Sequence, residues 1–266
     1  MILPSVSALV PSLTLVVAAG YAGPVVLQSR SGAAARIAFF AAWALHAVLL
    51  ALGLGGDVPR FGFAPALSVT AWLVATVYLI ELRFYPQLQL RWSLCLLGTV
   101  VVVLAWAFPG APLPERTSVW LPLHLALGIG SYGLIGAAVV HAVLMGRAEG
   151  RIRVAADPHS SLPLLTLERL IFRFVLAGFV LLTATLFLAL VFGDALYGRA
   201  GVLRWDHKSV FSLLSWLVFA ALLLGRVQFG WRGRRATRML YAGSGLLFLA
   251  YVGSRFVLEV ILGRGT

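Results

Sequence analysis

The stretch "RLIFRFVLAGFVLLTATLFLALVFG", residues 169–193, decides the class of fold. Two arginines stand near its start, and no charged residue follows Arg173 until Asp194. A helix needs about 20 apolar residues to cross the hydrocarbon core of a bilayer. This segment therefore predicts a transmembrane helix that begins beside a basic loop.

The same pattern recurs along the whole chain. The 266 residues are 61% hydrophobic and only 11% charged, far from the composition of a soluble domain. Breaks rich in Pro, Gly or charge separate eight predicted spans: 3–27, 35–55, 65–82, 92–108, 121–145, 169–193, 207–229 and 236–262. We predict an all-α, polytopic membrane helix bundle that forms a single transmembrane domain over residues 1–266.

The basic residues predict the orientation of this bundle. Loops after the odd-numbered spans hold fourteen Lys and Arg residues, and loops after the even-numbered spans hold five. Basic loops stay in the cytoplasm, so both termini should lie outside. The net charge of +12 is explained by this asymmetry and by contact with membrane lipid, and no nucleic-acid partner is expected.

Several kinds of chemistry are excluded by the residues present. Cys95 is the only cysteine and stands in an apolar run, so neither a disulfide framework nor a Cys-based metal site is expected. No GxSxG, P-loop or HExxH motif occurs. An enzyme that works with side chains alone is therefore not expected, and chemistry by a bound cofactor stays open.

Two histidines occupy matching positions in this topology. His124 falls in the first turn of the fifth span and His207 in the first turn of the seventh, both at the predicted external face. Imidazoles from two helices can ligate one haem iron from opposite sides. Trp120 and Trp205 precede them and could flank a macrocycle. The alternative is that all four are interfacial residues of the kind that membrane helices commonly carry.

Two further histidines lie deeper in the predicted spans. His46 lies in the middle of the second span and His141 near the cytoplasmic end of the fifth, and an ionisable group at such depth is a functional candidate. Together they are candidates for a second, inner site. The alternative is that each forms hydrogen bonds that stabilise helix contacts. His159, in the longest loop, is expected to be solvated.

Other residues near the external face have two interpretations each. Arg204, Lys208 and Arg255 are candidates to receive a haem propionate, because guanidinium binds carboxylate in a bidentate manner. Arg255 stands four residues before Glu259, so a helix ion pair is the alternative. Asp206 can cap the seventh span or orient an imidazole N–H. The glycines of "LGIGSYGLIG", residues 127–136, favour close helix packing, and would also admit a flat ligand below His124.

The segments "LPLHLALGIGSYGLIGAAVV" and "LRWDHKSVFSLLSW" carry a resemblance to a known family. Residues 65–262 resemble the cytochrome c assembly protein family, and are most similar to its short HemX-like or YpjD-like inner-membrane branch. The resemblance implies a bacterial inner-membrane protein that binds haem b, with His124 as an external ligand. Trp205, Asp206 and Lys208 are shared with a family motif in which a proline stands where this chain has His207. We infer that His207 is the opposing ligand.

The chain also departs from the larger members of the family. Their tryptophan-rich external loop is reduced here to "DALYGRAGVLRWD", and their large external domain is missing. A stand-alone cytochrome c synthase is therefore not expected. We expect haem handling, export or delivery, with other cytochrome c maturation components or a membrane protein as possible partners. The alternatives are a regulator of haem biosynthesis and a non-haem accessory subunit of another membrane protein.

Overall fold

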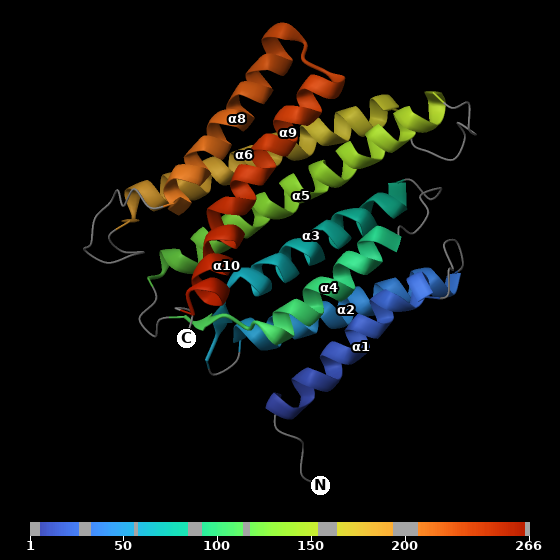
Figure 1. Ribbon diagram of the computed structural model, residues 1–266, viewed down its shortest axis with the longest axis vertical. Helices are drawn as coiled ribbons and strands as arrows, with labels where there is room; N and C mark the ends of the chain where they lie inside the picture. Colours follow the sequence, from blue (N-terminus) through green and yellow to red (C-terminus); the bar gives the residue numbers. More distant parts are fainter. Residues whose placement is uncertain are drawn as a thin grey trace. The chain divides into compact units, whose positions relative to one another are not determined.

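The computed structural model describes residues 6–26, 33–55, 58–84, 92–113, 118–153, 164–193 and 207–263. Its helices are α1 (Val6–Val26), α2 (Ala33–Gly55), α3 (Phe63–Phe84), α4 (Trp92–Ala107), α5 (Trp120–Arg153), α6 (Leu164–Val191), α8 (His207–Phe229) and α9 (Gly233–Phe248). The helix that begins with α9 continues through a π-helical turn η2 (Leu249–Gly253), α10 (Ser254–Phe256) and a second π-helical turn η3 (Val257–Ile261). Two short strands, β1 (Arg60–Phe61) and β2 (Ala111–Pro112), complete the described elements (Figure 1).

The predicted polytopic helix bundle is confirmed. Seven helical stretches in the described part of the chain are long and apolar enough to cross a membrane, and α4 is a shorter apolar helix of 16 residues. Most helix limits lie within three residues of the predicted spans, and two lie further away: α5 continues to Arg153 and α6 begins at Leu164. Residues 146–153 read GRAEGRIR, and Arg, Ala and Glu are good helix formers. The helix therefore continues beyond the end of its apolar segment. The side on which the termini lie stays a prediction.

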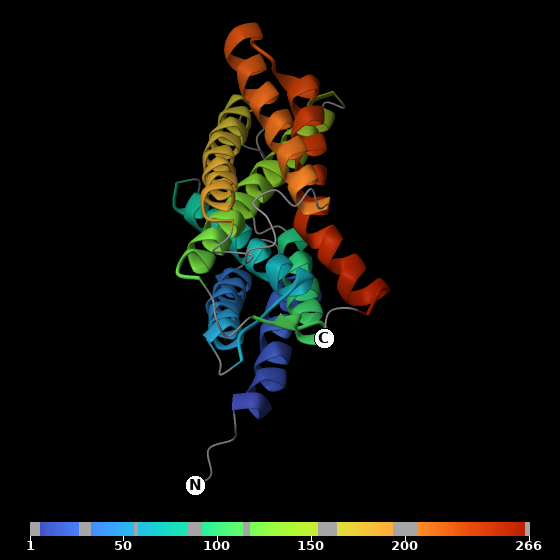
Figure 2. The same cartoon turned by 90° about the vertical axis from the view of Figure 1, so that its left-hand side faces the viewer.

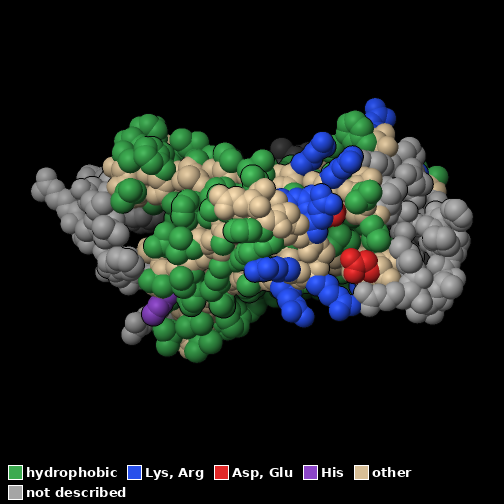
Figure 3. Space-filling view, turned by 90° about the horizontal axis from the view of Figure 1, so that it is seen from above, with side chains coloured by type: hydrophobic (Ala, Val, Ile, Leu, Met, Phe, Trp, Pro, Cys, Tyr) green, Lys and Arg blue, Asp and Glu red, His purple; other side chains and the backbone are tan. Residues whose placement is uncertain are grey.

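Many large apolar side chains point away from the protein interior. Leu15, Ile37, Phe187 and Val227 are among the exposed ones, as expected for helices that contact lipid. Figure 3 shows hydrophobic side chains over much of one face, with Lys and Arg side chains gathered in one region of it. Exposed apolar side chains of this kind are expected on the outer surface of a membrane-embedded bundle.

The chain divides into two compact units. The first comprises Met1–Leu113 and Arg255–Thr266, and the second Pro114–Ser254. Whether both belong to one domain, as the sequence predicts, stays a prediction.

The first unit is built from α1, α2, α3 and α4. Helix α1 packs against α2 and α4, and α3 packs against the same two helices, which closes a ring of four (Figures 1 and 2). The antiparallel strands β1 and β2 join the connections that precede α3 and follow α4. Gly110 is required here, because its φ of 80° is left-handed and a Cβ would meet the backbone of Phe61 and Gly62.

Two stacked tryptophans fix α2 against α3 in this unit. The rings of Trp43 and Trp72 lie 5.4 Å apart between centroids, at an interplanar angle of 5°. Each indole N–H also has a partner, since Trp43 donates to Thr76 Oγ1 at 2.8 Å and Trp72 donates to the Trp43 carbonyl at 3.0 Å. Indoles in an apolar bundle are satisfied by such partners, so both rings are held in one orientation.

The second unit is built from α5, α6, α8 and α9. Helices α5 and α8 each pack against both α6 and α9, and so occupy opposite corners of the unit. Figures 1 and 2 show the long helices α5 and α6 side by side and the hairpin formed by α8 and α9. Serine hydroxyls bridge neighbouring backbones, with Ser131 donating to the Gly178 carbonyl and Ser215 to the Gly243 carbonyl, each at 2.9 Å. Small residues thus allow the close approach that packs helices in membranes.

Candidate functional site

His124 lies in the second turn of α5, close to its first residue. Ser118 caps this helix, because its hydroxyl accepts a hydrogen bond from the backbone N–H of Trp120 at 3.3 Å. Pro122 stands in the first turn, where backbone N–H groups have no intrahelical partner. The half-buried imidazole of His124 lies close to the backbone of Thr185 on α6. The cap and this contact fix the histidine at the edge of the α5–α6 pair.

The glycines below His124 serve helix packing. A Cβ on Gly128 would meet the methyl group of Thr185 at 3.7 Å, and one on Gly130 would meet Leu181 at 3.0 Å. A Cβ on Gly178 of α6 would likewise lie 2.8 Å from Cδ1 of Ile135 on α5. Side chains of the partner helix therefore fill the α5–α6 contact, and a flat ligand would have to lie outside it.

Trp120 joins the beginning of α5 to the end of α6. Its ring stacks on Phe192, with centroids 4.1 Å apart and an interplanar angle of 19°. One face of the indole is thus covered by the protein. The other side of Trp120 remains exposed, as expected of a residue at the end of a transmembrane helix.

His207 is the first residue of α8, as the sequence predicts, and its side chain is exposed. The adjacent Lys208 lies with its Nζ 5.8 Å from the centroid of the Tyr251 ring in η2. Helices α5 and α9 run in opposite directions, since residues 142–150 of α5 lie beside residues 234–241 of α9, whereas the earlier Tyr132 donates its hydroxyl hydrogen to the later Leu247 carbonyl. The beginnings of α5 and α8 therefore lie at the same end of the second unit.

The remaining candidates at the predicted external face are placed differently. Arg204, Trp205 and Asp206 lie outside the described residues. Arg255 belongs to the first unit, where its Nη1 lies 4.0 Å from Glu259 Oε1. The predicted i,i+4 ion pair is therefore present. Whether any of these residues meets a haem propionate stays a prediction.

His46, one of the two deeper histidines, has hydrogen-bond partners on two neighbouring helices. Its Nδ1 lies 3.3 Å from the Tyr21 hydroxyl of α1, and its Nε2 lies 2.8 Å from the Ser68 hydroxyl of α3. The side chain is 1% exposed. Both ring nitrogens thus join helices of the first unit, which is the structural role that the sequence left as the alternative.

His141 has a similar environment in the second unit. Its Nδ1 donates to the Ala137 carbonyl one turn back at 2.7 Å, and its ring packs on Phe174 of α6. His46 and His141 belong to different units. A shared inner site stays a prediction. Within the described ranges, His, Cys, Asp and Glu form no group of three that could hold a metal ion.

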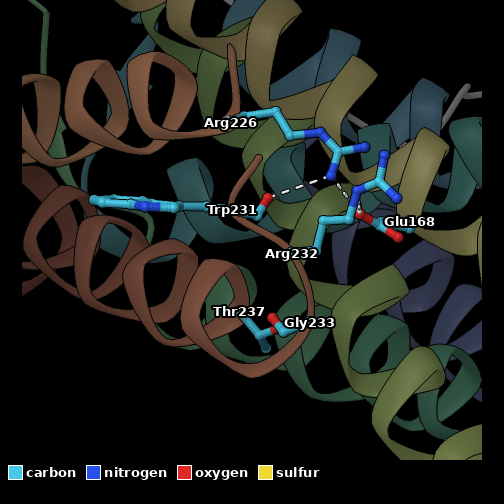
Figure 4. Close-up of polar contacts among 6 residues, drawn as sticks. All are labelled: Glu168, Arg226, Trp231, Arg232, Gly233 and Thr237. Atoms are coloured by element: carbon cyan, nitrogen blue, oxygen red, sulfur yellow. Dashed lines mark hydrogen bonds and ion pairs between the residues drawn. The ribbon is translucent and has the colours of Figure 1, made fainter. Parts of the chain in front are cut away.

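A charged cluster that sequence reasoning missed joins α6 to the α8–α9 connection (Figure 4). Arg226 Nη1 lies 2.7 Å from Glu168 Oε1, and Arg232 Nε lies 3.7 Å from the same oxygen. Arg226 also donates to the Trp231 carbonyl at 3.3 Å and lies over the ring of Phe172. A lone glutamate beside a basic loop was the available signal, since Glu168 directly precedes Arg169 in the sequence.

The fold is that of a multi-pass helical membrane protein, and its two candidate ligands, His124 and His207, lie at the same end of a four-helix unit. The sequence matches the family model described as Cytochrome C assembly protein over residues 6–262. The chain belongs to the cytochrome c assembly protein family. The match begins well before residue 65, where the resemblance was expected to start.

Several curated proteins are similar to this chain. Inner membrane protein YpjD of Escherichia coli K12 is 33% identical over 141 residues, which cover 52% of each protein. An uncharacterized 28.8 kDa protein of Azospirillum brasilense is 31% identical over 209 residues, which cover 74% of this chain and 76% of that protein. The cytochrome c biogenesis protein CcsA of Synechococcus sp. CC9902 is 28% identical over 229 residues, covering 74% and 75%.

The chain spans about half the length of the E. coli relatives that it matches. These similarities, together with the apolar helices, confirm the predicted multi-pass localisation in the inner membrane.

Proposed function

We propose that this protein binds haem b at one end of its second unit and handles haem for cytochrome c biogenesis. One observation carries the proposal. This chain, which belongs to the cytochrome c assembly family, has His124 and His207 at the same end of a four-helix unit. The CcsA relatives, which are named for cytochrome c biogenesis, support the process. The proposal places the haem in the membrane, with lipid around the bundle and other maturation components as partners.

The donor set fits haem iron. Helices α5 and α8 occupy opposite corners of the unit, so His124 and His207 would hold a haem iron from different sides. His207 is exposed and open to a ligand, whereas His124 is half-buried and held by α6. Because side chains fill the α5–α6 contact, the macrocycle would lie beyond it, toward the beginning of α8. The bound haem would supply an iron centre that exchanges electrons and axial ligands.

The chain's own residues would orient the group. The cap on α5 and the backbone of Thr185 close to His124 would limit the orientations of its imidazole. Lys208, beside His207, would attract a propionate, and Arg204 would add a second cation. Trp120, Trp205 and Asp206 would border the macrocycle. Arg255 and the pair His46 and His141 are secondary candidates.

Absorbance spectroscopy of purified protein tests this proposal. The protein is expressed with ample haem, and the Soret band is measured for the wild type, His124→Ala and His207→Ala. We expect a Soret band in the wild type that is lost or shifted in both variants, because each removes one residue that would hold the haem iron. His159→Ala provides the matched control and should leave the band unchanged.

Two outcomes would contradict the proposal. One is a wild-type protein without a Soret band after expression with haem, which would favour the non-haem accessory role. The other is a band that both ligand variants keep while pyridine extraction shows an unchanged haem content. A band lost only in His124→Ala would retain the haem site and remove His207 from it.

A further inference from the structure

A cleft opens between the end of α5 and the beginning of α9, at the opposite end of α5 from His124. Its volume is about 480 Å³, within the range of about 300 to 1,000 Å³ that is usual for small-molecule sites. The lining comes from residues 142–150 of α5 and residues 234–241 of α9, all of them in the second unit. The cleft is therefore large enough for a ligand the size of a lipid headgroup.

Three arginines and one glutamate line this cleft, namely Arg147, Arg234, Arg238 and Glu149. All three guanidinium groups are exposed, and none forms an ion pair within the described part of the chain. This distinguishes them from the arginines that surround Glu168 in the same unit. The cleft thus keeps an excess of positive charge, and arginine binds phosphate oxygens in a bidentate manner.

The walls of the cleft are also partly apolar. Val143 and Tyr241 line it and are exposed on the outer surfaces of α5 and α9. Both helices are apolar enough to span a membrane, so these side chains continue the lipid-facing surface up to the arginines. A ligand with an anionic head and an apolar body would match this arrangement better than a small free anion.

We propose that this cleft is a binding site for the phosphate headgroup of an acidic phospholipid. The guanidinium groups of Arg147, Arg234 and Arg238 contact the phosphate, and the acyl chains lie along the exposed apolar side chains of α5 and α9. This site does not depend on the proposed function at the other end of the unit.

Lipid binding to purified protein tests the proposal. Native mass spectrometry in detergent measures the binding of phosphatidylglycerol, cardiolipin and phosphatidylcholine to the full chain. The test variant is Arg147→Gln/Arg234→Gln/Arg238→Gln. The matched control is Arg169→Gln/Arg173→Gln/Arg235→Gln, which removes three exposed arginines of the same unit that do not line the cleft.

We expect the wild type and the control to bind the acidic lipids in preference to phosphatidylcholine. One basic residue at an anionic lipid surface contributes about fivefold in affinity, so the test variant should bind roughly 100-fold more weakly. Its thermal midpoint in lipid-free detergent shows whether it is folded. A variant that fails to fold is replaced by the single substitution Arg238→Gln, for which we expect a weakening of about fivefold.

Three results would overturn the proposal. Equal binding of phosphatidylcholine and acidic lipid by the wild type would remove the headgroup preference. An equal loss in test and control variants would show that general charge attracts the lipid. Inorganic phosphate that raised the thermal midpoint as much as acidic lipid does at the same concentration would assign the cleft to a free anion.

Discussion

Replacing Glu168 by glutamine should destabilise the second unit by about 1–3 kcal/mol. The carboxylate is 14% exposed and lies 2.7 Å from Arg226, which is 24% exposed. Exposed ion pairs contribute about 0–1 kcal/mol, and removing one partner of a fully buried pair costs about 3–5 kcal/mol. The pair is intermediate in burial, so an intermediate loss is expected.

A second arginine at the same carboxylate provides the comparison. Arg232 lies 3.7 Å from Glu168 and its side chain is 66% exposed, so Arg232→Gln should cost less than about 1 kcal/mol. In a double-mutant cycle, the coupling of Glu168 with Arg226 should exceed its coupling with Arg232. The difference follows from distance and burial, since the change of side chain is the same in both arginines.

Unfolding of the purified protein with increasing fractions of sodium dodecyl sulfate gives the free energy of unfolding for each variant. Tryptophan fluorescence follows the transition, and Trp231 lies beside the ion pairs. The reasoning is refuted if Glu168→Gln changes the free energy of unfolding by less than about 0.5 kcal/mol, within the usual range of surface substitutions. Equal coupling energies for the two arginines would refute it as well.

Three further predictions concern packing, the buried histidine and orientation. Gly225→Ala should cost about 1–3 kcal/mol in unfolding free energy, because a Cβ would collide with the indole of the α8–α9 connection, whereas Gly245→Ala meets nothing and should be neutral or stabilising. His46→Leu should lower the unfolding free energy by about 1–3 kcal/mol, because it leaves the hydroxyl groups of Tyr21 and Ser68 without this partner. A loss of the Soret band in this variant would contradict the structural role of His46. A membrane-impermeant maleimide added to intact spheroplasts should label Val119→Cys, at the predicted external face, and spare Phe229→Cys, at the predicted cytoplasmic face. The native Cys95 is buried and should not react. The opposite pattern would reverse the predicted orientation.

Most helix limits were predictable because the bilayer sets the length of an apolar segment. The seventh predicted span, 207–229, coincides with α8, and a charged residue directly precedes it in the sequence. The limits of α5 were less predictable, because its last residues, 146–153, are charged and still helical. The two π-helical turns after Phe248 were not predicted, since each depends on local packing that apolar periodicity does not record.

The histidines show where sequence reasoning about the site ends. The position of His124 near the beginning of a helix followed from the apolar run, but its contact with Thr185 joins residues far apart in the sequence. The partners of His46 are likewise on α1 and α3, and neither Tyr21 nor Ser68 carries a motif that marks it. Helix spacing predicts depth in the membrane, whereas the direction of a side chain depends on the packing of the neighbouring helices.

The stacked pair Trp43 and Trp72 gives the first unit an optical signal of its own. Two indoles held nearly parallel at 5.4 Å couple their electronic transitions, and wherever the two transition dipoles are not aligned this coupling contributes a paired band of opposite signs to the ultraviolet circular dichroism. Because both rings belong to the first unit, this signal should disappear when α2 and α3 separate, even while the other unit keeps its structure. Spectra recorded during unfolding can therefore follow the two halves of the protein separately, without any added dye.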